Sequence, residues 1–220
     1  VIESIAKLVA TGADLQKIRL TFQEFYERLT DEQAWSKPLK SLLGAFIPSK
    51  FFNAPAIGGK DSMSGTFENI CVPPTLISFA VTTGDLEHIT SQDFKGKGRI
   101  GLVNIEYDEN GMLDLDELKD NMGKIHKDIV DGNIITAIAV NHKGTLPLIY
   151  ANAVGNTGFD VKLKDLYSPR YGTFIVEYLE DRDFIENIGE FSEGVKVNGE
   201  TLEEETLKEN YLHTLDKVFK

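Results

Sequence analysis

The sequence predicts a mixed α/β (α+β) fold, and two observations carry that prediction. Segments with helical apolar spacing alternate along the chain with short runs of β-branched and apolar residues typical of strands. The composition, 41% hydrophobic and 26% charged in 220 residues, is ordinary for a globular protein and sufficient for one large or two small domains. No internal repeat or low-complexity tract interrupts the alternation.

The N-terminal part is expected to hold two helices and two strands. Ser36-Lys37-Pro38 has the form of a helix start, with serine as the N-cap and proline early in the helix. The expected elements are a helix over 1–10 that ends at Gly12, a strand over 18–22, a helix from Ser36 to near Pro48, and a strand over 75–83.

The C-terminal part continues the alternation. Residues 134–140 are nearly all apolar, so we expect this strand in the centre of a sheet. The expected elements are strands over 99–107, 134–140, 159–163 and 173–178, helices over 115–130, 146–154 and 203–219, and a tight turn at Asn198-Gly199. Glycines and polar residues between Gly84 and Gly98 indicate a domain boundary, so we expect domains over 1–90 and 97–220.

The charge and cysteine content exclude several classes of protein. A net charge of −12 argues against a nucleic-acid or anionic-membrane partner, because phosphate-rich surfaces select for basic proteins. Cys71 is the single cysteine, so disulfides within the chain and cysteine metal cages are excluded. No apolar run reaches the length of a membrane span, and a reducing cytoplasm is the expected location. The chain begins on Val1 inside a helical pattern, which favours a piece of a larger protein.

A glycine-rich segment, Gly58-Gly59-Lys60-Asp61-Ser62, lies just before Gly65 and the strand expected over 75–83. Its glycines allow positive φ and close backbone approach, so we expect a loop with open N–H groups. Lys60 would supply a charge for phosphate, and Asp61 an oxygen for magnesium. The segment is not a P-loop, because Asp61 follows Lys60 and position 54 is alanine. A phosphate-binding loop and a tight turn with solvated charges both stay open as interpretations.

A second candidate site is an acidic stretch over 106–117. Counted from Glu106, oxygen-bearing side chains fall at positions one, three, five and nine, Gly111 at six and Glu117 at twelve, which is close to an EF-hand calcium loop. However, the EF-hand loop follows a helix, whereas residues 99–107 favour a strand. The alternative is an Asn-Gly turn before an acidic helix start.

Several segments, taken together, resemble the phosphoribosylformylglycinamidine synthase family in its large single-chain form. The resemblance covers essentially the whole chain, and the segment Lys60-Asp61-Ser62-Met63 is fairly specific to this family within its superfamily. It rests on residues 10–15 (ATGADL), 56–65 (AIGGKDSMSG), 72–80 (VPPTLISFA), 83–85 (TGD), 153–159 (AVGNTGF), 171–177 (YGTFIVE) and 214–219 (TLDKVF).

The resemblance implies part of an ATP- and glutamine-dependent carbon–nitrogen ligase of purine biosynthesis. It implies a partial N-domain and a C-domain of the aminoimidazole ribonucleotide synthetase-like superfamily, from the auxiliary half of the synthetase core. No catalytic residue is then expected in this chain, and the glutaminase lies elsewhere. The implied ligands are ATP or ADP, magnesium and a ribonucleotide substrate. The implied partners are the remaining domains of the parent and, through residues 51–83, a second copy in a homodimer.

The family's site residues carry over unevenly. Gly58, Gly59, Lys60, Asp61 and Ser62 are intact and are expected to contact a nucleotide or substrate phosphate. Glu3 matches a magnesium ligand, and with Asp61 it forms the expected metal set. Lys7 stands where the family has an asparagine ligand, and His142 where many relatives have an aspartate; both departures weaken the expectation of bound magnesium.

Two alternatives to this assignment remain open. One is another ATP-dependent enzyme of the same superfamily, such as selenophosphate synthetase or thiamine monophosphate kinase. The other is a calcium-binding module that uses residues 106–117.

Overall fold

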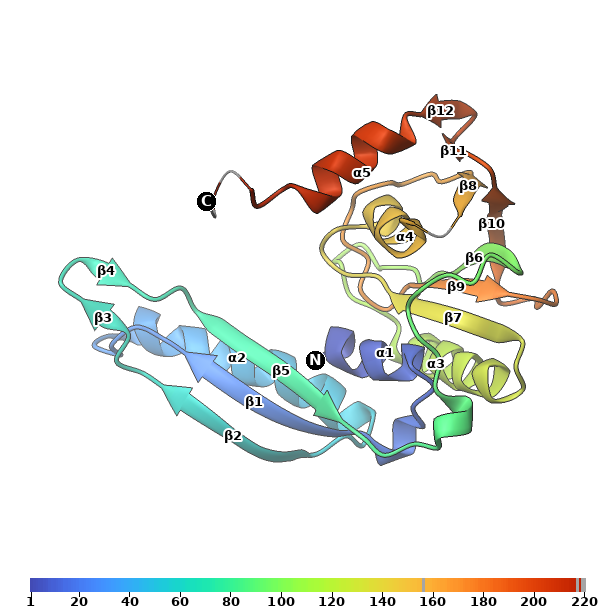
Figure 1. The fold of residues 1–220 in the computed structure, drawn as a ribbon. Coiled ribbons are helices and arrows are strands. Elements are labelled where there is room, and N and C mark those ends of the chain that lie inside the picture. Colours follow the sequence, from blue (N-terminus) through green and yellow to red (C-terminus); the bar gives the residue numbers. More distant parts are fainter. Residues whose placement is uncertain (156, 217, 219–220) are drawn as a thin grey trace.

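The computed structural model describes residues 1–155, 157–216 and 218, and its strands form three sheets (Figure 1). A small sheet and a short hairpin occupy the N-terminal part. The elements of that part are α1 (Ile2–Ala10), the 3₁₀ turn η1 (Leu15–Lys17), β1 (Arg19–Phe25), α2 (Glu32–Phe51), β2 (Ala56–Ser62), β3 (Thr66–Phe67), β4 (Ile70–Cys71), β5 (Thr75–Val81) and η2 (Leu86–His88).

The small sheet has the order β2-β1-β5, with β2 parallel and β5 antiparallel to β1. It forms an arm that extends from the rest of the molecule, with α2 behind it in Figure 1. Leu20 and Ala80, which are paired across β1 and β5, belong to the main hydrophobic core. The strand expected over 75–83 is confirmed, and the strand expected over 18–22 runs further, to Phe25.

Helix α2 begins before the expected start, so the prediction from Ser36 and Pro38 is wrong. Asp31 is the N-cap, and its Oδ1 accepts the N–H of Ala34 at 2.8 Å. Pro38 and Pro48 both lie inside the helix, which continues to Phe51. Both prolines are buried, so packing of this face offsets the backbone hydrogen bonds that proline cannot donate.

A seven-stranded sheet forms the C-terminal part, in the order β12-β11-β8-β10-β6-β9-β7. Its strands and helices come from residues 99–212. They are β6 (Arg99–Val103), α3 (Leu115–Val130), β7 (Ile134–Ala139), α4 (Thr145–Ala153), β8 (Gly158–Val161), β9 (Phe174–Tyr178), β10 (Glu186–Ser192), β11 (Val195–Val197), β12 (Glu200–Leu202) and α5 (Glu204–Leu212).

Helices cover both faces of this sheet. Val176 packs with α1 and α3 in one core cluster, and the neighbouring Ile175 packs with α4 in a second. Because α1 also contacts β5 of the small sheet, the first cluster is continuous across the segment 84–98. The two parts of the chain therefore share one core, and the division into domains 1–90 and 97–220 stays a prediction.

Strand β7 is at the edge of the sheet, so the expected central position is wrong. Its apolar sequence is explained by the helices on its two faces and by the segment that follows η2. Thr90 Oγ1 donates to the carbonyl of Ile135 at 2.5 Å, and Thr136 Oγ1 donates to the carbonyl of Asp93 at 3.0 Å. Because helices cover both faces of β7 and a connecting loop covers its edge, this edge strand is as apolar as a central strand would be.

The remaining expectations have mixed outcomes. The helix over 115–130, the helix near 146–154 and the strands near 159–163 and 173–178 are confirmed within two residues. The Asn198-Gly199 turn is confirmed, with φ of +53° and +87°. Strand β6 ends at Val103 rather than residue 107, and α5 ends at Leu212 rather than residue 219. Parts of the segments 153–159 and 214–219 lie outside the described residues.

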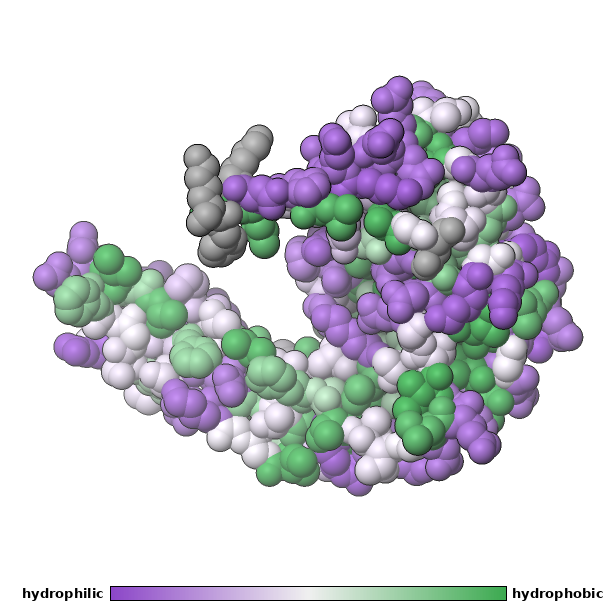
Figure 2. Space-filling model, in the orientation of Figure 1, coloured by the Kyte–Doolittle hydropathy of each residue, from purple (hydrophilic) through white to green (hydrophobic). Residues whose placement is uncertain are grey.

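One face of the small sheet exposes apolar side chains (Figure 2). Ile77, Phe79 and Val81 of β5 share this face and are 38%, 47% and 49% exposed. Helix α2 also exposes Trp35, Leu39, Leu42 and Phe46, which recur at helical spacing. No described helix combines the length and the apolar composition needed to cross a bilayer.

Candidate functional site

The expected glycine loop is instead a strand, because residues 56–62 form β2 and pair with β1. None of Gly58, Gly59 and Gly65 has a positive φ, so that part of the prediction is wrong. Close packing by neighbouring atoms is the reason for glycine at two of these positions. A Cβ on Gly59 would lie 2.7 Å from the carbonyl oxygen of Phe22, and one on Gly65 would lie 2.3 Å from Cγ1 of Val72.

The charged residues of β2 project to opposite faces of the sheet. Lys60 lies with its Nζ 5.0 Å from the centre of the Phe25 ring and has no ion pair with a described residue. Asp61 is paired in register with Glu24 of β1. Burial, and secondarily the charge of Asp61, raise the pKa of Glu24. Since β2 ends the sheet order, its outer edge is open among the described elements.

The two expected metal ligands lie on different elements. Glu3 is on α1, and its Oε1 lies 2.6 Å from the Nζ of Lys7, one helical turn further along. Asp61 is on β2 beside Glu24. Within the described residues, no group of three or more His, Cys, Asp and Glu side chains is placed to hold a metal ion. His142 is exposed in the turn before α4. The assignment of Glu3 and Asp61 to magnesium therefore stays a prediction.

The acidic stretch over 106–117 forms a closed turn. Tyr107 and Leu113 form an antiparallel bridge across it, and Oδ1 of Asp108 accepts the N–H groups of Asn110 and Met112, each at 2.8 Å. These hydrogen bonds, chiefly that from Met112, lower the pKa of Asp108. Asp114 caps α3. A strand precedes the turn, so the geometry matches the turn interpretation.

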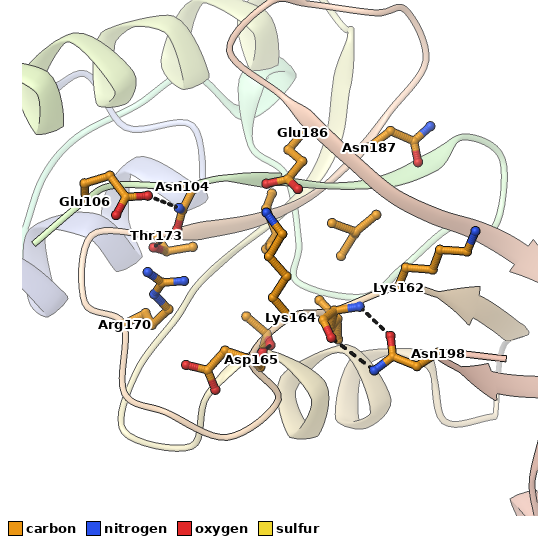
Figure 3. Close-up of a pocket in the computed structure, with 14 residues that line it drawn as sticks. Asn104, Glu106, Lys162, Lys164, Asp165, Arg170, Thr173, Glu186, Asn187 and Asn198 are labelled. Atoms are coloured by element: carbon orange, nitrogen blue, oxygen red, sulfur yellow. Dashed lines mark hydrogen bonds between the residues drawn. The ribbon is translucent and has the colours of Figure 1, made fainter. Parts of the chain in front are cut away.

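A pocket of about 450 Å³ lies on the C-terminal part (Figure 3). Sequence reasoning did not single it out. Its polar lining comes from six regions of the chain: the segment after β6, the start of α4, the segment after β8, the start of β9, the start of β10, and the turn between β11 and β12. The residues concerned are Asn104, Glu106, Thr145, Lys162, Lys164, Asp165, Arg170, Thr173, Glu186, Asn187 and Asn198.

Hydrogen bonds within the chain fix part of this lining. Asn104 Nδ2 donates to Oε1 of Glu106 at 3.2 Å, and Thr173 Oγ1 donates to Oδ1 of Asn104 at 3.3 Å. Asn198 Oδ1 accepts the N–H of Leu163 at 2.9 Å, and its Nδ2 donates to the carbonyl of the same residue at 3.1 Å. The pocket therefore has a rigid polar wall on two sides.

One sequence signal for the pocket exists but is weak. Lys162 and Lys164 alternate at the end of a strand, and Arg170 follows Ser168-Pro169. Charges at the end of a strand are common on protein surfaces. Only the pairing of β10 with β6 and β8 brings Glu186 and Asn187 to the same place.

Comparison with known proteins gives a structural likeness. No protein-family model matches the sequence, and no curated protein matches it. The structure of PurLQS from Thermotoga maritima matches with a TM-score of 0.64 and 17% identity, over 87% of this chain and 31% of that one. The Thermotoga maritima PurL complexed with AMPPCP matches with a TM-score of 0.64 and 13% identity, over 92% of this chain and 39% of that one. This chain thus spans about a third of the length of these relatives.

Two smaller proteins match over most of their own length. The hydrogenase maturation protein HypE in complex with ATP has a TM-score of 0.65 and 12% identity, over 92% of this chain and 78% of that one. AaThiL complexed with AMPPCP and TMP matches with a TM-score of 0.59 and 12% identity, over 90% of this chain and 75% of that one. The chain has the fold of this group, which is the aminoimidazole ribonucleotide synthetase-like fold.

Proposed function

We propose that this chain is part of an ATP-dependent enzyme of the aminoimidazole ribonucleotide synthetase-like superfamily. More specifically, we propose that it belongs to the auxiliary half of a cytoplasmic phosphoribosylformylglycinamidine synthase. In that role it stabilises the synthetase core and presents Gly58–Ser62 to a nucleotide or to substrate phosphate. The catalytic ATP site and the glutaminase then lie in other parts of the parent protein.

The observation that carries this proposal is the match of both parts of the chain, in one arrangement, to PurL structures. The likeness to the AMPPCP complex extends over 92% of this chain. The order of motifs from residues 10–15 to 171–177 supports the narrower assignment.

The residues of β2 fit a phosphate group well and a magnesium ion only in part. Gly58 and Gly59 leave the strand edge without side chains, and Lys60 is a cation without an ion pair to a described residue. Asp61 beside Glu24 offers two carboxylates whose repulsion a divalent cation would relieve. Glu3 fits less well, because Lys7 already neutralises it.

A second candidate function is another ATP-dependent enzyme of the superfamily. It is favoured by the likeness to HypE and AaThiL, which are covered over 78% and 75% of their lengths. The synthase is favoured instead by the segment Gly59-Lys60-Asp61-Ser62-Met63. A substrate test separates the two, because only the synthase converts formylglycinamide ribonucleotide.

The test uses the parent protein and this chain side by side. The parent, given formylglycinamide ribonucleotide, ATP and glutamine, is expected to release ADP, whereas this chain with ammonia in place of glutamine is expected to release none. In the parent, Lys60→Ala should lower kcat/KM about tenfold or more, because a charge-assisted hydrogen bond contributes about 1.5–3 kcal/mol. Lys196→Ala, an exposed lysine on β11, is the matched control and should leave the kinetics unchanged.

Two results would overturn the proposal. Turnover by this chain alone would contradict the auxiliary role. Unchanged kinetics in Lys60→Ala would reduce the β2 segment to a structural strand.

A further inference from the structure

We propose that the pocket in Figure 3 binds a phosphorylated small molecule, with its phosphate held by Arg170 and Lys164. This inference goes beyond the proposed function, because no residue of β2 lines the pocket. It rests on three features: two cations that form no ion pair with a described residue, acidic groups of which two already accept hydrogen bonds, and a size suited to a small ligand.

Arg170 is the central feature of the site. It is half-buried and lines the pocket together with Thr173 and Asn104 (Figure 3). No described residue accepts a hydrogen bond from this guanidinium or forms an ion pair with it. An arginine side chain has five N–H donors in a planar fork that matches two oxygens of a phosphate. A half-buried fork with open donors is therefore a binding group for an oxyanion.

Lys164 supplies the second charge. Its side chain extends into the pocket toward Glu186 in Figure 3, and it too has no ion pair with a described residue. Lys162 comes from the same segment but points away from Arg170. Lys162 and Lys164 are two residues apart, so the alternation of side chains along an extended segment would place both on the same face. Only the tertiary structure shows which of the two extends toward the phosphate position.

No described acidic residue forms an ion pair with Arg170, although the charge of Arg170 is the least of the causes that lower the pKa of Asp165. Asp165 Oδ1 accepts the backbone N–H groups of Ser168 and Tyr167, and these bonds, led by that from Ser168, hold its pKa below the usual range. Oε1 of Glu106 already accepts a hydrogen bond from Nδ2 of Asn104. Glu186 faces the pocket opposite Lys164 in Figure 3 and is an acceptor for a hydroxyl group.

The dimensions and the mixed lining define the ligand class. A pocket of about 450 Å³ is within the range of small-molecule sites and much larger than one anion requires. Leu102, Leu163 and Ile188 add apolar surface to the polar wall. Two cations favour a phosphate monoester over a carboxylate, because the monoester has a charge of about −1.5 to −2 at neutral pH. Asn187 and Glu186 would bind hydroxyl groups of the attached sugar or polyol.

The experiment is calorimetric titration of the chain with ribose 5-phosphate in phosphate-free, low-salt buffer. Ribose alone is the ligand control and inorganic phosphate is the anion control. We expect ribose 5-phosphate to bind at least about tenfold more tightly than either control, since each charge-assisted hydrogen bond contributes about 1.5–3 kcal/mol. Ribose of equal affinity would overturn the proposal, as would the absence of binding by all three probes.

Variants locate the binding. Arg170→Gln should weaken the binding of ribose 5-phosphate about tenfold or more, and Lys164→Gln should weaken it several-fold. Neither side chain forms an ion pair with a described residue, so the melting temperature should change little. Lys196→Gln, an exposed lysine on β11 that does not line the pocket, is the matched control and should leave the affinity unchanged. Lys60→Ala should not affect this binding, which separates the pocket from the site on β2. Full affinity in Arg170→Gln would overturn the inference.

Discussion

The carboxylate of Glu177 accepts a hydrogen bond from the backbone N–H of Lys97, with Oε1 2.7 Å from the nitrogen. The N–H of Lys95 donates to Oε2 at 2.6 Å, and that of Gly98 donates to Oε1 at 3.1 Å. Glu177 lies on β9 and is fully buried, whereas its three donors belong to the segment that joins the two parts of the chain. A single acid therefore fixes this connection against the large sheet.

We expect Glu177→Gln to destabilise the protein by about 3 kcal/mol, because the amide removes the charge and turns a donor toward backbone N–H groups that then lack an acceptor. Urea unfolding measures the loss. Hydrogen exchange at the amides of Lys95 and Lys97 should accelerate more than exchange in α3. Glu190→Gln, on the exposed surface of β10, is the control and should change stability by less than about 0.5 kcal/mol. Equal stability of the two variants would contradict the role of Glu177.

Glu24 and Asp61 predict a dependence of stability on pH. Burial first, and the charge of Asp61 second, raise the pKa of Glu24 above its ordinary value of 4.5. The folded state therefore binds this proton more tightly than the unfolded state. The stability contributed by Glu24 is complete below the unfolded pKa and is lost as the pH rises through the folded pKa.

At neutral pH, Glu24→Gln should accordingly raise the melting temperature, and below pH 4.5 the gain should disappear. Asp61→Asn should reproduce part of the gain, because Asp61 is the second cause of the shift. Glu87→Gln, in η2, serves as the control without a gain. Thermal scans over this pH range check the prediction, and a gain that is the same at every pH would refute it.

The open face of the small sheet predicts association between copies of the chain. Ile77, Phe79 and Val81 form an exposed apolar strip on β5, and such strips on small proteins commonly bind a partner. We expect concentration-dependent dimerisation through residues 51–83, measured by light scattering, and its loss in Phe79→Glu. Leu86→Glu changes a residue that is 88% exposed but outside the sheet, and should not affect association. A monomer at every concentration would exclude the dimer.

The turn over residues 106–117 predicts no specific response to calcium. Oδ1 of Asp108 is already engaged by two backbone N–H groups, and the bridge between Tyr107 and Leu113 closes the turn. Calorimetric titration with calcium should give no binding heat above that of Asp108→Asn, which keeps one acceptor oxygen for the turn. Saturable binding that Asp108→Asn abolishes would restore the calcium-loop interpretation.

The sequence determined those elements whose local signals agree with their final environment. Helix α3 begins and ends where its apolar spacing predicts. The Asn198-Gly199 turn forms because both residues adopt the positive φ that they tolerate best. The alternation of such elements was enough to predict the α/β class, and the Gly-Gly-Lys-Asp-Ser segment was visible without any structure.

Tertiary contacts decided what local chemistry left open. Pairing with β1 extends Gly58–Ser62 into a strand, because ladder hydrogen bonds and the close approach to Phe22 outweigh the freedom of glycine. Burial of Pro38 and Pro48 keeps α2 intact through residues that would end an isolated helix. The pocket around Arg170 exists only because β6, β8, β9 and β10 pair out of chain order, which brings Glu106 and Glu186 to the same site.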